Sequence, residues 1–222
     1  MKHKFWVLIL FFTVQVFDLY GQSDTTQYLF GFTPYHLFVQ AIKTDFEVAR
    51  YDSGKIRSIK VSPSVYQGKS GAYENYRFDY AGDRISGFGM DFSFKFGEEI
   101  MRRDKAIFGE LGIGYQHINI KYEGFVWDTQ VVDGITYLVS REAVITEKVD
   151  RVDLFFLFSR RANIFYSENL KATYFFGPVY RISKITSSGI PREHFGFLQH
   201  GSDGVFLRVG ITIEAVFFTK IK

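Results

Sequence analysis

The most constraining feature of the chain is a run near its C-terminus, residues 204–218, in which apolar and polar residues alternate. Every odd-numbered position from Val205 to Phe217 carries an apolar residue. The opposite face includes charged and small residues, namely Arg208, Gly210, Thr212 and Glu214. Because successive side chains of a β-strand point to opposite sides, this pattern predicts a long strand with one apolar face and one polar, narrow face.

The same period-two pattern recurs along the rest of the chain. It is cleanest at 88–96, where the even positions are Phe or Met and the odd positions are Gly, Asp, Ser or Lys. Less regular versions of the pattern occupy 38–48, 59–66, 107–122, 152–166 and 171–182. A first strand at 27–33, before the break at Pro34, brings the predicted set to eight strands and places both termini at the same end of the sheet.

The connectors between these strands alternate in length. Short connectors at 52–55, 97–104 and 167–169 alternate with long ones at 67–84, 123–148 and 183–203. Up-and-down antiparallel barrels have this order, with tight turns at one end and long loops at the other. The long connector 123–148 contains Asp133-Gly134 between apolar runs, which is a strong hairpin signal, so we expect it to rise as a ribbon above the barrel.

The N-terminal residues follow the order of a secretory signal peptide. Lys2 and Lys4 give a positive start, residues 5–12 are apolar, and Gly21 is a small residue before a polar stretch. The apolar part is far shorter than the roughly 20 residues of a spanning helix. We therefore expect a signal peptide at 1–21, cleaved after Gly21, and one mature domain at 22–222; a retained membrane anchor is the alternative.

Composition excludes several classes of function. The chain has no cysteine, which excludes disulfides and thiolate chemistry. Its 27 basic and 24 acidic residues give no clustered basic face, so nucleic-acid binding is not expected. Aromatic residues make up 19% of the chain, and aromatic side chains suit strands, lipid-facing surfaces and interfacial girdles.

The signal peptide, the alternating strands, the glycine-rich run 108–117 and the closing strand 204–218 together resemble the small outer-membrane β-barrel protein family, of the eight-stranded porin-like or membrane-anchor class. The resemblance implies an all-β fold: an eight-stranded antiparallel up-and-down transmembrane β-barrel with short periplasmic turns and three long outer loops. It also implies contact with outer-membrane lipid and with the outer-membrane insertion machinery. One departure is the C-terminus, where the tail 219–222 follows Phe217 and Phe218 in place of a terminal aromatic residue.

The alternative fold is a soluble periplasmic barrel whose apolar faces point inward. Alternation alone does not separate the two folds, because the same pattern arises whether the apolar faces point into the barrel or away from it. The polar faces favour the membrane barrel, since they carry small residues that suit a tight lumen better than a solvated exterior. These small residues are the glycines at 89, 112, 114, 177 and 210.

Charged residues also lie on the predicted inward faces, namely Lys43, Asp45, Glu47, Lys60, Asp91, Lys95, Glu110, Arg208 and Glu214. The interior of an eight-stranded barrel is just wide enough for side chains to fill it. Acidic and basic groups placed there must pair, because an unpaired buried charge is costly. We therefore expect a lumen ion-pair network that plugs the barrel; a selective channel or a proton path is the functional alternative.

Two of the long connectors carry candidate functional residues. Tyr73, Tyr76 and Tyr80 lie among small polar residues in 67–84, a composition typical of adaptable binding surfaces and also of interfacial aromatic girdles. His194 and His200 share 183–203 with serines and acids, which suits an acid–base catalyst at the outer rim. Their spacing matches no standard metal motif, so neither a metal nor another cofactor is expected.

The sequence thus predicts a non-enzymatic outer-membrane β-barrel with a structural or surface-binding role and an unidentified surface ligand. A lipid-modifying enzyme of the deacylase or acyltransferase type, acting at the outer rim, is the first alternative. A narrow pore is the second alternative.

Overall fold

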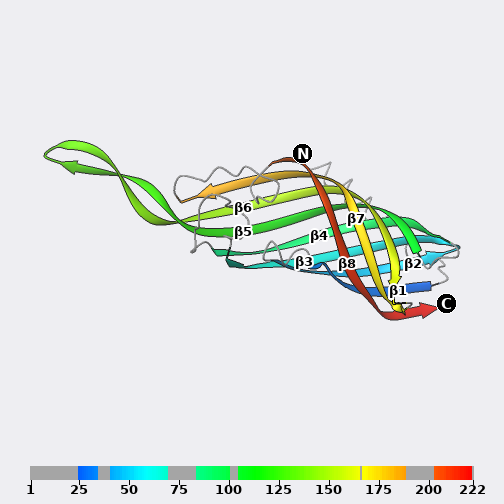
Figure 1. Ribbon diagram of the computed structural model, residues 1–222. Helices are drawn as coiled ribbons and strands as arrows, with labels where there is room; N and C mark the ends of the chain where they lie inside the picture. Colours follow the sequence, from blue (N-terminus) through cyan, green and yellow to red (C-terminus); the bar gives the residue numbers. More distant parts are fainter. Residues whose placement is uncertain are drawn as a thin grey trace.

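The computed structural model describes residues 25–34, 41–69, 84–100, 105–165, 167–188 and 203–221. The strands of this part are β1 (Thr25–Phe32), β2 (Ala41–Asp52), β3 (Lys55–Lys69), β4 (Arg84–Ile100), β5 (Lys105–Val132), β6 (Ile135–Ile164), β7 (Ser167–Ser187) and β8 (Gly204–Ile221). Each strand pairs antiparallel with the next, and β1 also pairs with β8, so the sheet closes into a barrel (Figure 1). The predicted all-β, antiparallel, up-and-down sheet is confirmed.

The two ends of the barrel differ in their connections. At the end that we call the turn end, Ser53-Gly54 joins β2 to β3 in a tight turn with positive φ at both residues. Thr25 pairs with Ile221 at this end, so β1 starts where β8 finishes. At the opposite end, which we call the ribbon end, β5 and β6 continue far beyond the other strands (Figure 1).

The predicted connector 123–148 is not a loop. β5 and β6 stay paired through it, from Glu123 opposite Val144 to the turn at Asp133-Gly134. Both turn residues have positive φ, 53° and 77°, as a type I′ hairpin turn requires. The ribbon expected from the Asp-Gly signal is therefore confirmed, and the strand–strand pairing extends over its whole length.

Several predicted strand ends are displaced. β2 continues to Asp52, beyond the predicted end at Val48, and β4 runs to Ile100, into the predicted connector 97–104. The predicted connector 167–169 is wrong, because β7 begins at Ser167 and the turn falls at Phe165, whose φ is 51°. Backbone pairing with a neighbouring strand continues past the last alternating side chain, so the side-chain pattern underestimates strand length.

Inward and outward side chains alternate along the strands, and the apolar side points outward. Val205, Leu207 and Val209 of β8 are 74%, 54% and 52% exposed, whereas Thr212 and Glu214 on the opposite face are buried. In β4 the even positions of 88–96 point outward and the odd positions are buried inside the barrel. The apolar faces of the predicted strands therefore form the outer surface of the barrel rather than its core.

Apolar side chains fill the parts of the interior that charged residues do not occupy. A cluster at the ribbon end consists of Ala41, Tyr66, Ile85, Ile118, Ile120, Tyr122, Ile145 and Val149. A cluster at the turn end consists of Leu29, Ala49, Ile56, Ala106 and Phe108. A third cluster contains Phe155, Leu157 and Val179. Apolar side chains therefore pack inside the barrel near both of its ends.

Gly177 marks a close approach between β7 and β6. A Cβ added at this position would lie 2.1 Å from the carbonyl oxygen of Phe156 and 2.8 Å from the Cα of Leu157. Both atoms belong to the backbone of the paired strand, so neither can move aside as a side chain does. Only glycine fits here without a shift of the sheet.

We expect Gly177→Ala to destabilise the folded barrel by about 1–3 kcal/mol, the usual cost of overpacking. The matched control is Gly109→Ala, where the new Cβ would meet only the ring of Phe96, at 2.6 Å. Phe96 points outward and can swing away, so this variant should be close to the wild type. Urea unfolding of the refolded protein in detergent measures both, and equal stability of the two variants would contradict the close approach.

Candidate functional site

The candidate functional site is the charged interior of the barrel. All nine charged residues predicted to face the lumen occupy inward positions, on β2, β3, β4, β5 and β8. The buried ones are Asp45, Glu47, Asp91, Lys95, Glu110 and Glu214. The side chains of Lys43, Lys60 and Arg208 are each 12% exposed. Strands that are far apart in the sequence thus bring these charges into one narrow space.

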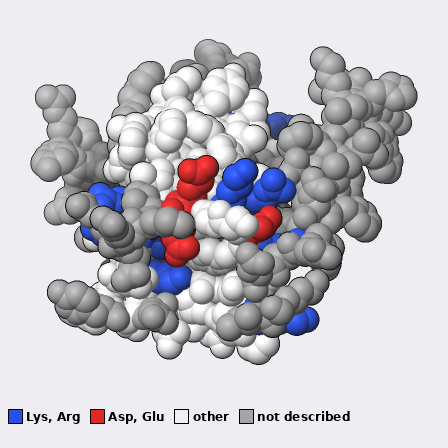
Figure 2. Space-filling model, turned by 90° about the vertical axis from the view of Figure 1, so that its right-hand side faces the viewer, with Lys and Arg blue, Asp and Glu red and all other residues white. Residues whose placement is uncertain are grey.

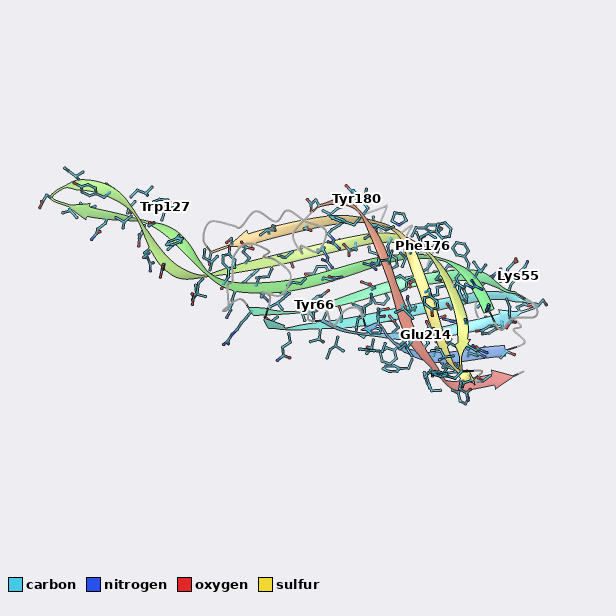
Figure 3. All side chains as sticks on the ribbon, in the orientation of Figure 1. Lys55, Tyr66, Trp127, Phe176, Tyr180 and Glu214 are labelled. Carbon is cyan, nitrogen blue, oxygen red and sulfur yellow. The ribbon has the colours of Figure 1, made fainter. Side chains whose placement is uncertain are left out.

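One group of charges, which we call the inner charge cluster, consists of Glu47, Lys95, Arg161 and Glu214 (Figure 3 labels Glu214). Lys95 Nζ lies 2.5 Å from Glu47 Oε2, and Arg161 Nη2 donates to both oxygens of Glu47 at 2.9 and 2.8 Å. Arg161 Nε lies 2.7 Å from Glu214 Oε2. Two cations and two carboxylates, each at most 3% exposed, make a neutral buried cluster.

A second charge cluster consists of Lys43, Asp91, Asp153, Arg181 and Arg208. Arg208 bridges the two carboxylates, with Nη1 3.2 Å from Asp91 and Nη2 3.0 Å from Asp153. Lys43 Nζ lies 2.5 Å from Asp91, and Arg181 Nε lies 2.9 Å from Asp153. Arg151 Nε also lies 3.5 Å from Asp153, so Asp91 has two cationic neighbours and Asp153 has three, which compensates the loss of water around them.

Three of the nine predicted residues lie outside these two clusters. Lys60 Nζ is 2.6 Å from Glu110 Oε1, which also accepts a hydrogen bond of 2.7 Å from Ser93. Asp45 forms no ion pair with the described residues, and its Oδ2 accepts a hydrogen bond of 3.0 Å from the hydroxyl of Thr33. The network thus contains both ion pairs and neutral donors.

Little free space remains between these groups. Lys43, Asp45, Lys60, Glu110 and Arg208 contribute to the lining of a cavity of about 20 Å³. A cavity of this size has room for about one water molecule. The charged side chains thus fill the middle of the barrel and act as its core.

Sequence analysis missed several inward charges, namely Glu147, Arg151, Asp153, Arg161, Lys171 and Arg181. They lie on β6 and β7, where an unbroken apolar run at 154–158 and the adjacent pair Arg160-Arg161 hide the alternation. Counting every second residue from Asp153 would have placed Arg151 and Arg161 on the same face. The alternation is therefore present in the sequence, but the apolar run 154–158 hides which of its positions face inward.

A separate polar cluster lies on the outward face near the ribbon end. Asp150 Oδ1 accepts a hydrogen bond of 2.7 Å from the hydroxyl of Tyr115 and lies 2.8 Å from His117 Nδ1. Asn119 Nδ2 lies 3.3 Å from His117 Nε2. These contacts fix the imidazole as a donor to Asp150 and an acceptor from Asn119.

Several predicted loop residues lie outside the described residues. They are Tyr73, Tyr76 and Tyr80 in 67–84, and His194 and His200 in 183–203. Among the residues that the structure describes, no group of three or more His, Cys, Asp and Glu side chains is arranged to hold a metal ion.

Comparison with known proteins adds no relative. No family model matches the chain, and no match was found among curated proteins or among solved structures. In the described part of the chain, no helix has the length and apolar character needed to cross a membrane.

We expect Glu47→Gln to destabilise the barrel by about 3–5 kcal/mol, because it leaves the two buried cations Lys95 and Arg161 with one carboxylate, Glu214, in place of two. The control is Asp128→Asn, which removes an exposed pair with Arg141 in which both side chains are at least 60% exposed. Such exposed pairs contribute about 0–1 kcal/mol. Thermal unfolding in detergent compares the two variants, and similar losses would contradict a structural role for the inner charge cluster.

Proposed function

We propose that the protein is an integral outer-membrane β-barrel without enzymatic activity, whose eight described strands cross the bilayer. In this proposal the filled lumen makes the barrel a rigid, closed scaffold, and the β5–β6 ribbon binds a ligand or a neighbouring molecule outside the cell. The single observation that carries the proposal is the combination of an exposed apolar band outside the closed sheet with paired charges inside it.

The apolar band surrounds the barrel. Outward apolar side chains on every strand contribute to it, including Phe30, Phe46, Val65, Phe92, Leu111, Leu154, Phe176 and Leu207, all at least 40% exposed. Figure 3 labels Phe176 and Tyr180 on the outer side of β7. Monomeric soluble proteins rarely expose a contiguous apolar patch larger than a few hundred Å². A bilayer would remove this surface from water without any partner protein.

The band also has the height that a membrane requires. On β4 it covers the nine residues 88–96, and a tilted transmembrane strand needs roughly 9–11 residues. Polar outward residues bound it at both ends: Arg57, Glu98 and Arg160 at the turn end, and Lys148 and Lys184 at the ribbon end. This distribution supports a band that spans the hydrocarbon, with charged side chains at the two polar interfaces.

The ribbon provides the surface for binding. The last pair between β4 and β5 is Arg84 with Lys121, and β5 and β6 continue to Asp133-Gly134. Apolar side chains in this extension are exposed, among them Phe125, Trp127, Val131, Leu138 and Val144 (Figure 3 labels Trp127). An isolated two-stranded ribbon is only marginally stable in water, so a partner that covers its side chains would stabilise it.

The membrane proposal predicts that two leucine-to-lysine substitutions differ in their effect on the stability of the inserted barrel. Leu111→Lys places a charge in the middle of the apolar band and should cost about 2–4 kcal/mol, as for a cation at the bilayer midplane. Leu138→Lys, on the ribbon, should have little effect, although both leucines are exposed, at 52% and 65%.

Membrane fractionation and heat-modifiable gel migration measure insertion and closure of the wild type and both variants. We expect the wild type and Leu138→Lys in the outer-membrane fraction as heat-modifiable species, and Leu111→Lys strongly reduced. Recovery of all three proteins in the soluble periplasm would overturn the proposal, because a soluble barrel tolerates a lysine on its exposed surface.

The outward Asp150–His117 pair favours a second candidate, a lipid-modifying enzyme acting at the outer rim. A carboxylate that orients a histidine is part of many acyl-transfer sites. The imidazole Nε2 that would act as the base faces the amide of Asn119 at 3.3 Å, which weakens this candidate.

Lipid analysis of cells separates the two candidates. The non-enzymatic proposal predicts the same lipid profile for cells that produce the wild type, His117→Gln or the control Lys121→Gln, since the histidine then only contributes polar surface. A change in lipid acylation that requires the wild type and is lost with His117→Gln alone would establish the enzyme instead.

A further inference from the structure

Lys171 is the exception among the buried cations of the lumen. Each of the other inward cations of the described part lies within 4 Å of a carboxylate, in pairs such as Lys60–Glu110 and Lys95–Glu47. Lys171 is only 9% exposed, yet it forms no ion pair with the residues that the structure describes. Its Nζ donates one hydrogen bond of 2.9 Å to Gln27 Oε1 and lies 5.8 Å from the centre of the Tyr51 ring.

Lys171 lines a pocket of about 220 Å³ at the turn end of the barrel. The other lining residues are Gln27, Tyr51, Glu99, Lys105, Ala106, Arg161 and Asn163. Figure 2 looks onto this end and shows acidic and basic side chains close together near the middle of the face. The pocket therefore opens at the end opposite the ribbon, below the inner charge cluster.

Arg161 also lines this pocket and carries an unsatisfied donor. Its Nε and Nη2 are occupied by Glu214 and Glu47, but its buried Nη1 has no hydrogen-bond partner among the described residues. Such a buried donor is costly unless a ligand or solvent satisfies it. The same guanidinium thus binds both carboxylates of the inner charge cluster, keeps one unsatisfied N–H group and belongs to a residue that lines the pocket.

We propose that this turn-end pocket binds a small oxyanion, a carboxylate or phosphate group, held by Lys171 and by Nη1 of Arg161. Charge-assisted hydrogen bonds from ammonium and guanidinium groups to such oxygens are among the stronger ones in proteins. The amides of Gln27 and Asn163 supply neutral donors in the same lining.

The charge of the lining favours a small anion with one or two negative charges. Arg161 is already neutralised by Glu47 and Glu214, and Glu99 offsets one of the two lysines, Lys105 and Lys171. One positive charge therefore remains uncompensated. The volume lies below that of pockets for drug-sized ligands, which span roughly 300–1,000 Å³. This site does not depend on the proposed binding role of the ribbon, which lies at the other end of the barrel.

Calorimetric titration of the full mature chain, refolded in a zwitterionic detergent, tests the proposal. Sodium phosphate and sodium acetate are titrated separately at constant ionic strength in a chloride buffer, and the two arms distinguish a phosphate site from a carboxylate site. We expect saturable binding of at least one anion, with affinity about tenfold weaker in Lys171→Gln. The matched control Lys121→Gln, which removes an outward lysine of β5, should bind as the wild type does.

A second variant tests the same pocket independently, in case Lys171→Gln does not fold. Lys105→Gln lies on the pocket lining and should weaken binding severalfold while leaving the heat-modifiable migration of the barrel unchanged. Absence of saturable binding of both anions to the wild type would overturn the proposal. Equal affinity in the wild type, Lys171→Gln and Lys105→Gln would overturn it as well, because the anion would then bind elsewhere.

Discussion

The rest of the structure depends on the pairing of buried charges inside the closed sheet. Glu47 lies within 3 Å of both Lys95 and Arg161, and Arg208 joins the carboxylates of Asp91 and Asp153. Without these partners each group would be a charge in a space that excludes water, at a cost of several kcal/mol. The ion pairs therefore occupy the middle of this barrel, where many barrels carry an apolar core.

Because charged residues occupy the middle of the interior, many apolar residues of the regular strands lie on the outer surface. Side chains alternate along a strand, so strands with charged inner faces carry their Phe, Leu and Val residues outward, as in β4 and β8. The exposed apolar residues on the outer surface support the proposed bilayer location. The ribbon and the turn-end pocket lie beyond the two ends of this apolar band. Their polar groups can therefore contact water and polar ligands.

Much of this arrangement could be predicted from residue patterns. Runs 88–96 and 204–218 alternate cleanly, and the structure gives each the inward and outward faces expected. The apolar run 154–158 hides which positions of β6 face inward. Arg161 was therefore not predicted, although it binds both carboxylates of the inner charge cluster. Strand ends were displaced, because backbone pairing continues beyond the last alternating side chain, as in the ribbon.

The sequence by itself determined the class of fold and the face on which each regular strand carries its charges, because alternation is a local property of the chain. Only the tertiary structure decided which charges meet. Glu47 and Arg161 are 114 positions apart and come together because the sheet closes in one particular register. The same closure leaves Lys171 without a carboxylate partner among the described residues, and no local pattern distinguishes that lysine from its paired neighbours.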